Sequence, residues 1–528
     1  MNLRAKIKTR INMKIEGLAQ RLARSVQEQP DRVYARTMSG DITYRALSGA
    51  ADSVITRLEA AGLRRGDKVV VMMRNSPMSL AFIIALLKSG IVWVPANPAL
   101  VGAQLAHVIR RVEGSLIVCD PAASPAIEAC GTAARLGTMV IEDASLPQAA
   151  AKPWAGEMPE PSDLATIMFT SGTTGPAKGV QVTNMMMELA AKAVLLCADA
   201  KPGDNFYIWE PFYHIGGAQV LLLPFFEDVL LTVRDRFSAS QFWSDVSAAG
   251  CTHIHHLGGI IQLLLKQSHS RFDREHNVRV AWGGGCVPAA WRPFEERFGV
   301  EVRECYGMTE ASSLTTCNLE GVVGSVGRPL PWFEVQLKAD DGRVLGPGDG
   351  RGEIVVTTSL PGAIFSGYFN APEATAKALQ PDGFHTGDIG SWDENGMLFF
   401  HGRMSDSIRC RGENVSAYEV EATANRHPAV EESAMVGVPA EVGEYDMQLF
   451  LRLKPGTAVS EEDISNWLET QLAPYQRPRF ISFVDNFPKT PSQRIQKHLL
   501  PKEPRDRWER QSNRPVRKPP TGCSIGNR

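Results

Sequence analysis

The ten residues from Thr170 to Gly179 constrain this chain more than any other segment. They contain three glycines, four small hydroxyl side chains and one lysine, Lys178. The apolar run at 164–169 precedes them and is typical of a short buried strand. Glycines let successive backbone N–H groups turn towards one point, the hydroxyls add donors, and the lysine adds a positive charge. The segment therefore predicts a phosphate-binding loop after a strand, with a Gly/Ser-rich surface turn as the alternative.

A length of 528 residues exceeds what one hydrophobic core supports, so the chain should form at least two domains. Hydrophobic residues make up 44% and charged residues 22%, which is ordinary for a soluble globular enzyme. The net charge of −2 gives no general attraction to nucleic acid or to an anionic membrane. Nine scattered cysteines without a C-x-x-C pair suit reduced thiols. We therefore expect a cytoplasmic protein that binds neither nucleic acid nor membrane.

Helical patterns alternate with short β-rich runs over most of the length, which favours α/β layering. The predicted fold class is α/β, with a large N-terminal domain of layered α/β subdomains plus a β-rich subdomain, and a small mobile α+β C-terminal domain. The end of the chain is rich in Arg and Pro and lacks apolar periodicity, which predicts disorder. The expected boundaries are 1–402 for the large domain, 403–406 for a hinge, 407–500 for the small domain and 501–528 for the disordered tail.

Two further segments supply groups suited to a nucleotide. Tyr306-Gly307-Met308-Thr309-Glu310 follows a predicted strand and offers a ring that can stack on adenine, a hydroxyl for phosphate and a carboxylate for Mg²⁺. A capped turn is the alternative for this segment. His385-Thr386-Gly387-Asp388 offers a carboxylate that can accept both hydroxyls of a ribose, with a turn between strands as the alternative.

Other segments suggest walls of a ligand pocket. His214 lies before a pair of glycines, where a histidine is usually structural. The run Trp282–Cys286 has three glycines at its centre, so its backbone can approach a flat ligand. On a strand His253 and His255 would share one face and His256 the other, so the three cannot bind one metal ion. We therefore expect no catalytic metal other than Mg²⁺.

Taken in order, these segments resemble the motifs of the adenylate-forming superfamily, which includes acyl-CoA synthetases, peptide-synthetase adenylation domains and luciferases. The resemblance covers about residues 15–500 and is most similar to acyl-CoA ligases of the medium-chain, aromatic or carnitine-CoA ligase type. It implies ATP, Mg²⁺ and CoA as cofactors, a small carboxylic acid as substrate, and a homodimer. The nucleotide-binding residues that it implies are Thr170, Ser171, Gly172, Thr173, Thr174, Gly175, Lys178, Gly284, Tyr306, Thr309, Asp388 and Arg403.

The resemblance also implies the remaining roles. Lys178, His214 and Arg494 would be catalytic, and Glu310 would bind Mg²⁺. Gly412 would line the path of CoA, and Ser405 and Asp406 would form the hinge. An apolar acyl pocket would suit an aromatic, cyclic or medium aliphatic acid, although its residues could equally belong to the core. The expected pocket residues are Trp209, Phe212, His214, Trp282, Gly285 and Cys286, with Val326 and Trp332 as further candidates.

One departure from the family pattern concerns its C-terminal motif, P-x-T-x-S-G-K-I-x-K. Here Gln493 replaces the glycine, and Arg494 replaces the lysine that bridges the acid and the α-phosphate. Arginine keeps the charge but differs in bulk and geometry. Three alternatives stay open: Arg494 performs the task, Lys489 or Lys497 replaces it, or adenylation is weak and only the thioester step is efficient.

The resemblance implies a two-step reaction in which a carboxylate attacks ATP to give acyl-AMP and pyrophosphate, and CoA then displaces AMP. In the family the small domain rotates about the hinge between the two steps. Two other classes of function stay open. The acid could pass to a carrier protein in place of CoA, or the chain could be a weakened ligase that only binds a nucleotide or an acyl-adenylate.

Overall fold

The structure is a computed structural model, and it describes residues 14–131, 136–150, 152–170, 177–404, 407–410, 413–440, 445–472, 474–489, 494–501 and 507–510. These residues form two compact units. The larger unit contains the described residues up to 404 together with Lys489 and Arg494, and the smaller unit contains those from 407 to 488 and from 495 to 510. Several predicted site residues lie outside the described residues: Ser171, Gly172, Thr173, Thr174, Gly175, Ser405, Asp406 and Gly412.

A six-stranded sheet forms one part of the larger unit, and five of its strands are parallel. Successive residues of β3 pack on opposite faces, as strand geometry requires. Val69 and Val71 join one hydrophobic cluster with α3 and α4, whereas Val70 and Met72 join another with α5 and α6. The elements are, in spatial order of the strands, β6 (Gly137–Val140), β5 (Leu116–Cys119), β3 (Lys68–Met72), β4 (Val92–Pro95), β7 (Leu164–Thr170) and antiparallel β8 (Lys178–Thr183), with helices α3 (Tyr44–Ala60), α4 (Pro77–Ser89), α5 (Gly102–Val112) and α6 (Ser124–Ala129).

Helix α4 shows how the local sequence sets an element's limits. Ser76 and Ser79 form a capping box at its start, and Gly90 ends it in a left-handed conformation. Almost every residue of α4 is buried, so its sequence lacks the polar face of a surface helix. Lys88 is the charged exception, and its ammonium group lies 2.5 Å from the Asp52 carboxylate of α3.

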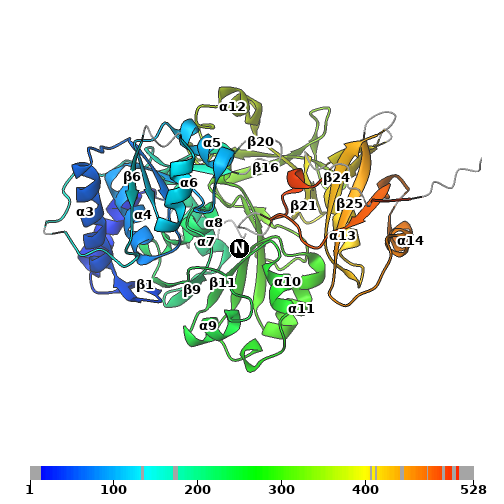
Figure 1. Cartoon of the computed structure of the whole chain (residues 1–528), viewed down its shortest axis with the longest axis horizontal. Helices are drawn as coiled ribbons and strands as arrows, with labels where there is room; N and C mark the ends of the chain where they lie inside the picture. Colours follow the sequence, from blue (N-terminus) through cyan, green and yellow to red (C-terminus); the bar gives the residue numbers. More distant parts are fainter. Residues whose placement is uncertain are drawn as a thin grey trace, which may run out of the picture. The chain divides into compact units, whose positions relative to one another are not determined.

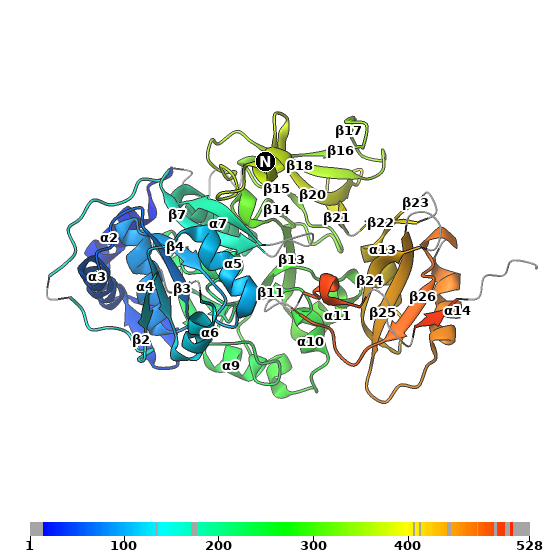
Figure 2. The same cartoon turned by 45° about the horizontal axis from the view of Figure 1, so that its top comes forward.

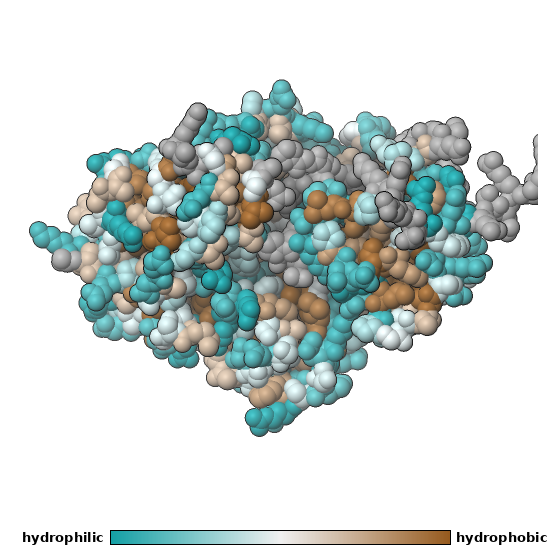
Figure 3. All heavy atoms as spheres, viewed as in Figure 1, coloured by the Kyte–Doolittle hydropathy of each residue, from teal (hydrophilic) through white to brown (hydrophobic). Residues whose placement is uncertain are grey.

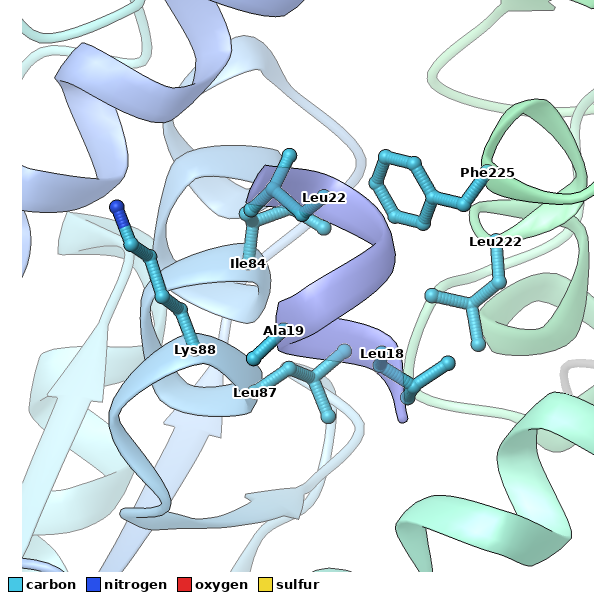
Figure 4. Close-up of a pocket in the computed structure, with 8 residues that line it drawn as sticks. All are labelled: Leu18, Ala19, Leu22, Ile84, Leu87, Lys88, Leu222 and Phe225. Atoms are coloured by element: carbon cyan, nitrogen blue, oxygen red, sulfur yellow. The ribbon is translucent and has the colours of Figure 1, made fainter. Parts of the chain in front are cut away.

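A small apolar cavity lies where α4 meets helix α2 (Leu18–Glu28) and the 3₁₀ turn η3 (Leu223–Phe225). Figure 4 shows leucine, isoleucine and phenylalanine side chains around it, and the amino group of Lys88 points away. None of the predicted site residues lines this cavity. We therefore attribute it to packing.

The second sheet has nine strands, and parallel strands occupy its centre. Helices α9, α10 and α11 lie together on one side of it (Figure 1) and share a hydrophobic cluster with Tyr207, Ile254 and Val302. The strands are, in spatial order, β15 (Arg328–Pro329), β14 (Thr316–Cys317), β13 (Glu301–Tyr306), β12 (Val280–Gly284), β11 (His253–Leu257), β9 (Asp204–Ile208), β10 (Val229–Val233), β1 (Val33–Thr37) and β2 (Gly40–Thr43). The helices are α7 (Asn184–Cys197), α8 (Ile215–Val220), α9 (Phe242–Ala248), α10 (Ile260–Leu265) and α11 (Pro288–Phe298), with 3₁₀ turns η4 (Arg271–Asp273) and η5 (Thr309–Ala311). A further 3₁₀ turn, η1 (Pro121–Ala123), precedes α6 beside the first sheet.

A third, antiparallel sheet completes the larger unit and is seen in Figure 2. Strands β20 and β21 pair so that Asp388 lies directly opposite Arg403. This register brings together two residues that the sequence motifs had singled out. The elements are β16 (Phe333–Lys338), β17 (Val344–Leu345), β18 (Gly352–Thr358), β19 (Leu379–Gln380), β20 (Gly383–Trp392) and β21 (Leu398–Arg403), with helix α12 (Pro372–Ala378).

The smaller unit is an α+β fold with its own core. A four-stranded sheet in the order β24-β25-β26-β27 packs with two helices, and β22 pairs with β23. The elements are β22 (Ser407–Cys410), β23 (Glu413–Ser416), α13 (Ala417–Ala424), β24 (Val430–Pro439), β25 (Tyr445–Leu453), α14 (Glu461–Gln471), β26 (Phe480–Phe483) and β27 (Trp508–Glu509), with 3₁₀ turns η7 (Pro474–Gln476) and η8 (Lys497–Leu499).

The prediction of disorder from residue 501 onwards is wrong for residues 508 and 509, which form a strand. Trp508 pairs with Ile481 in the sheet, and Arg479 forms a salt bridge with Glu509. Trp508 also packs against the hydrophobic core of the smaller unit. The average composition of the tail hides this one apolar contact. Residues 511–528 lie outside the described residues.

The predicted fold class is confirmed. The strand expected before the loop is β7. Within the described residues, no helix is both long enough and apolar enough to cross a membrane. Figure 3 shows hydrophobic residues in separate groups among hydrophilic ones on the visible face.

Candidate active site

Strands β7 and β8 form a hairpin whose ends fix the base of the glycine-rich loop. Thr170, the last residue of β7, is paired with Lys178, the first residue of β8. The Thr170 hydroxyl donates a hydrogen bond to the Lys178 carbonyl at 3.5 Å. The side chain of Lys178 is exposed. The hairpin therefore presents a lysine at the base of the loop, with its charge accessible to a ligand.

A tyrosine joins this lysine to the predicted metal ligand. The ammonium nitrogen of Lys178 lies 5.0 Å from the centre of the Tyr368 ring, within the range of a cation–π contact. The Tyr368 hydroxyl donates a hydrogen bond to Glu310 Oε1 at 2.9 Å. Lys178 and Glu310 are 132 positions apart in the chain, and both contact Tyr368.

Glu310 lies in η5, directly after strand β13, and is only 7% exposed. Burial raises the pKa of this carboxyl group, while its hydrogen bonds and Arg403 lower it. A buried carboxylate of this kind gains from a nearby cation. One carboxylate together with substrate phosphates and water is a common environment for Mg²⁺, so the donor chemistry fits that ion. Among the described residues, no group of three or more His, Cys, Asp or Glu side chains could hold a metal without such help.

Tyr306, Asp388 and Arg403 form a second cluster. The Tyr306 hydroxyl donates to Asp388 Oδ2 at 2.8 Å, although the two residues are 82 positions apart. The Arg403 Nε lies 3.2 Å from Asp388 Oδ1. Asp388 is only 2% exposed, so these partners hold its carboxylate in one orientation. The cluster is close enough to Glu310 for Asp388 to raise the pKa of that carboxyl group.

Arg494 lies with the same groups in the larger unit. Desolvation and the charge of Arg403 lower the pKa of the Arg494 guanidinium, and Asp388 raises it. Arginine starts from so high a pKa that it stays charged. The Arg494 charge also helps to lower the pKa of His214 to about 4, although burial is the larger cause. His214 is therefore neutral near pH 7, and its buried Nε2 has no hydrogen-bond partner within the part of the chain that is described.

The glycine run after Trp282 is explained partly by its own sheet. Gly283 has φ 153°, and a Cβ atom there would lie 1.8 Å from the His256 carbonyl oxygen of the adjacent strand. Beyond it, the Gly285 and Cys286 amides donate to the carboxylate of Glu304 at 2.5 and 3.1 Å. Burial raises the pKa of Glu304 to about 8. The bend at the end of β12 is thus fixed by a carboxyl group from β13.

The residues expected in the acyl pocket are all largely buried, apart from His214 and Gly285. They fall in two hydrophobic clusters: Trp209 and Cys286 belong to one, Phe212 and Trp282 to the other. Val326 and Trp332 join the cluster of Trp282. A shared acid pocket for these side chains therefore stays a prediction.

The three histidines of β11 have separate environments. His253 bonds through Nε2 to the Ala198 carbonyl at 2.9 Å. His255 bonds through Nδ1 to Glu210 at 2.5 Å and stacks on Trp282 with ring centres 4.0 Å apart. His256 Nε2 lies 3.8 Å from Glu304 Oε2. Each ring is thus set against a different group.

Sequence reasoning missed Tyr368, Glu210 and Glu304. Glu304 could have been noticed as a carboxyl group inside strand β13, because a charge without a partner is costly once that part of the strand is buried. Tyr368 carries no such local signal. Its contacts with Lys178 and Glu310 arise only when distant segments meet.

Comparisons with known proteins agree with this geometry. A family model described as AMP-binding enzyme matches residues 22–369, and one described as AMP-binding enzyme C-terminal domain matches residues 419–494. The 2-succinylbenzoate–CoA ligase of Geobacillus sp. is 31% identical, over 89% of this chain and 94% of its own. The sulfoacetate–CoA ligase of Cupriavidus necator is 29% identical, over 92% of this chain and 97% of its own.

Among solved structures, the ATP-bound MatB of Rhodopseudomonas palustris has a similar fold, with a TM-score of 0.82 and 27% identity, over 91% of this chain and 98% of that one. The chain therefore belongs to the AMP-binding enzyme family. Within that family it is an ATP-dependent, AMP-forming acid–thiol ligase, which uses ATP, Mg²⁺ and CoA. The superfamily and the enzyme class predicted from the motifs are confirmed.

Proposed function

We propose that the clusters of the larger unit perform the first half-reaction of this ligase on a small carboxylic acid. In that step an oxygen of the acid attacks the α-phosphorus of ATP, the bond to the β-phosphate breaks, and pyrophosphate leaves. The observation that supports this most is the grouping of Asp388, Arg403 and Arg494 beside Glu310. Arg403 lies 3.2 Å from Asp388, and the charges of this pair influence the pKa values of both Glu310 and Arg494.

Each side chain has a proposed task in this step. Asp388, held by Tyr306 and Arg403, accepts the ribose hydroxyls. Thr309 and the loop hydroxyls bind phosphate oxygens, and Lys178 neutralises charge on the β- and γ-phosphates. When bound, Mg²⁺ would be held by Glu310 and would supply positive charge to the phosphates. These tasks are mainly positioning and charge stabilisation.

Arg494 and neutral His214 act nearest the reacting carboxylate in this proposal. The Arg494 guanidinium can contact the acid and the α-phosphate at once, because its planar fork presents several donors. His214 has a low pKa, so it does not add a second positive charge beside Arg494 at neutral pH. It can stack on or hydrogen-bond to the acid as a neutral ring.

In the second half-reaction the thiol of CoA gives its proton to solvent, the thiolate attacks the acyl carbon, and AMP leaves with the electron pair of the bond that breaks. We propose that Gly412 lines the path of CoA and that Ser405 and Asp406 act as the hinge. A homodimer and a cytoplasmic location also stay predictions. Size measurement in solution and imaging of the tagged protein would check them.

The acid is proposed to be aromatic, cyclic or medium aliphatic, because tryptophan and phenylalanine dominate the candidate pocket residues. Two relatives are named for the polar acids sulfoacetate and 2-succinylbenzoate, so the panel of acids to be tested should include both. Trp282 stacks on His255, so a ring and a polar group already lie side by side there.

The direct test incubates the full chain with MgATP, CoA and a panel of these acids, and measures AMP, pyrophosphate and acyl-CoA. We expect all three products from at least one acid. Pyrophosphate without acyl-CoA, followed by transfer to a phosphopantetheine carrier, would identify the carrier protein as acceptor. ATP binding without turnover on any acid would contradict the proposal.

A further inference from the structure

The segment at 363–369 connects the phosphate-loop hairpin to the turn that carries Glu310. At one end, the Phe365 amide donates to the Glu310 carbonyl at 2.8 Å. At the other, the Phe369 amide donates to the Gly179 carbonyl at 2.8 Å. Tyr368 lies between these bonds and forms a β-bridge with Val180. The segment therefore spans two elements that the chain itself keeps far apart.

The backbone of Tyr368 is held by several contacts. Its amide donates to the Thr375 hydroxyl at 2.9 Å, and its ring packs edge-on against that of Phe365 at 4.9 Å. Phe365 is only 2% exposed. Burial, reinforced by Glu310, raises the pKa of Tyr368, so its phenol keeps its proton and acts as a donor.

Tyr368 contacts Lys178 and Glu310 without neutralising the charge of either. A direct ion pair between Lys178 and Glu310 would consume both charges. In the described part of the chain neither residue has an ion pair; each instead contacts a different part of one neutral side chain. The lysine charge and the carboxylate stay available for external partners, in a fixed arrangement.

We propose that Tyr368 is a positioning residue for the triphosphate and its divalent cation, with its ring orienting Lys178 and its hydroxyl orienting the Glu310 carboxylate. This inference rests on the function proposed above for Lys178 and Glu310. It assigns two separable tasks to one side chain, and two substitutions can separate them.

The test measures the Kd of ATP by calorimetry, once with excess Mg²⁺ and once with EDTA. Tyr368→Phe removes the hydroxyl and keeps the ring, so MgATP should bind about tenfold more weakly while metal-free ATP binds as before, since a hydrogen bond to a charged group is lost. Tyr368→Leu removes both contacts and should weaken binding in both conditions. Tyr44→Phe is the matched control, because it removes a buried hydroxyl that donates to the Pro224 carbonyl at 2.6 Å.

Glu310→Gln and Lys178→Met, measured in parallel, separate this inference from the function on which it rests. If both bind MgATP like the wild type, the proposed phosphate site fails and the role of Tyr368 fails with it. If both bind more weakly while Tyr368→Phe matches Tyr44→Phe, only the role of Tyr368 is overturned.

A double substitution tests the contact itself. In a Glu310→Gln background, Tyr368→Phe should have little further effect, because the charged acceptor has already gone. A full tenfold effect in that background would overturn the proposed coupling. Unfolding temperatures without ligand, compared with Tyr44→Phe, would show whether a loss of fold accounts for any change.

Discussion

Glu304 is a buried carboxyl group on strand β13, and its protonation makes the stability of the fold depend on pH. Burial raises its pKa from 4.5 to about 8. The folded state therefore holds a proton that the unfolded state releases between these values. The contribution of Glu304 to the free energy of unfolding is therefore full below pH 4.5 and is lost as the pH rises towards about 8.

The residue-scale prediction compares Glu304→Gln with the wild type. Glutamine does not titrate, so the free energy of unfolding of the wild type should fall relative to that of Glu304→Gln as pH rises from 5 to 8, by up to about 1.4 kcal/mol per pH unit. Urea unfolding at four pH values in this range measures it. Parallel curves for the two proteins would show that Glu304 does not titrate there.

At the scale of elements, helices α3 and α4 meet through a buried ion pair. Lys88 and Asp52 side chains are 9% and 6% exposed. Such a pair is costly to separate, because removing one partner leaves a charge without compensation in the interior. The contact also fixes the last turn of α4, just before Gly90 ends the helix.

Lys88→Met should therefore destabilise the protein by about 3–5 kcal/mol. The double variant Lys88→Met with Asp52→Leu should recover most of this loss, since neither charge then remains. Arg45→Ala breaks an exposed pair with Asp31 and serves as the control, which should unfold like the wild type. A single Lys88→Met variant as stable as the wild type would show that Asp52 finds another partner.

At the scale of the whole molecule, Arg494 belongs to the larger unit although its neighbour Ile495 belongs to the smaller one. Lys497, one alternative to Arg494, lies 2.8 Å from Glu421 within the smaller unit. The charge of Lys497 is thus already paired with a carboxylate of the smaller unit. The arrangement favours Arg494 as the cation for acid activation.

Arg494→Ala should reduce acyl-AMP formation by on the order of 10²–10³, because one central cation is lost. The thioester step, started from synthetic acyl-AMP and CoA, should keep its rate. Pyrophosphate release and acyl-CoA formation measure the two steps, Lys489→Ala tests the other candidate cation, and Arg45→Ala is the control. Equal loss in both steps would contradict a role confined to activation, and a large gain with Arg494→Lys would show that arginine limits the natural rate.

Local sequence determined the elements and the class of protein. The strand before the loop depends on neighbours in the chain, and so do the motifs around Lys178, Glu310 and Asp388. Such patterns can be recognised without knowing what packs against them. They sufficed to predict the fold class and the ligase chemistry.

Tertiary structure alone decided which of these groups meet. The bond from Tyr306 to Asp388 and the bridge from Lys178 through Tyr368 to Glu310 join segments that are distant in the chain. It also separated Trp209 from Trp282 into different clusters and placed Trp508 in a sheet. The reason is physical: the energy of such contacts depends on burial and distance, and both exist only after the sheets have packed.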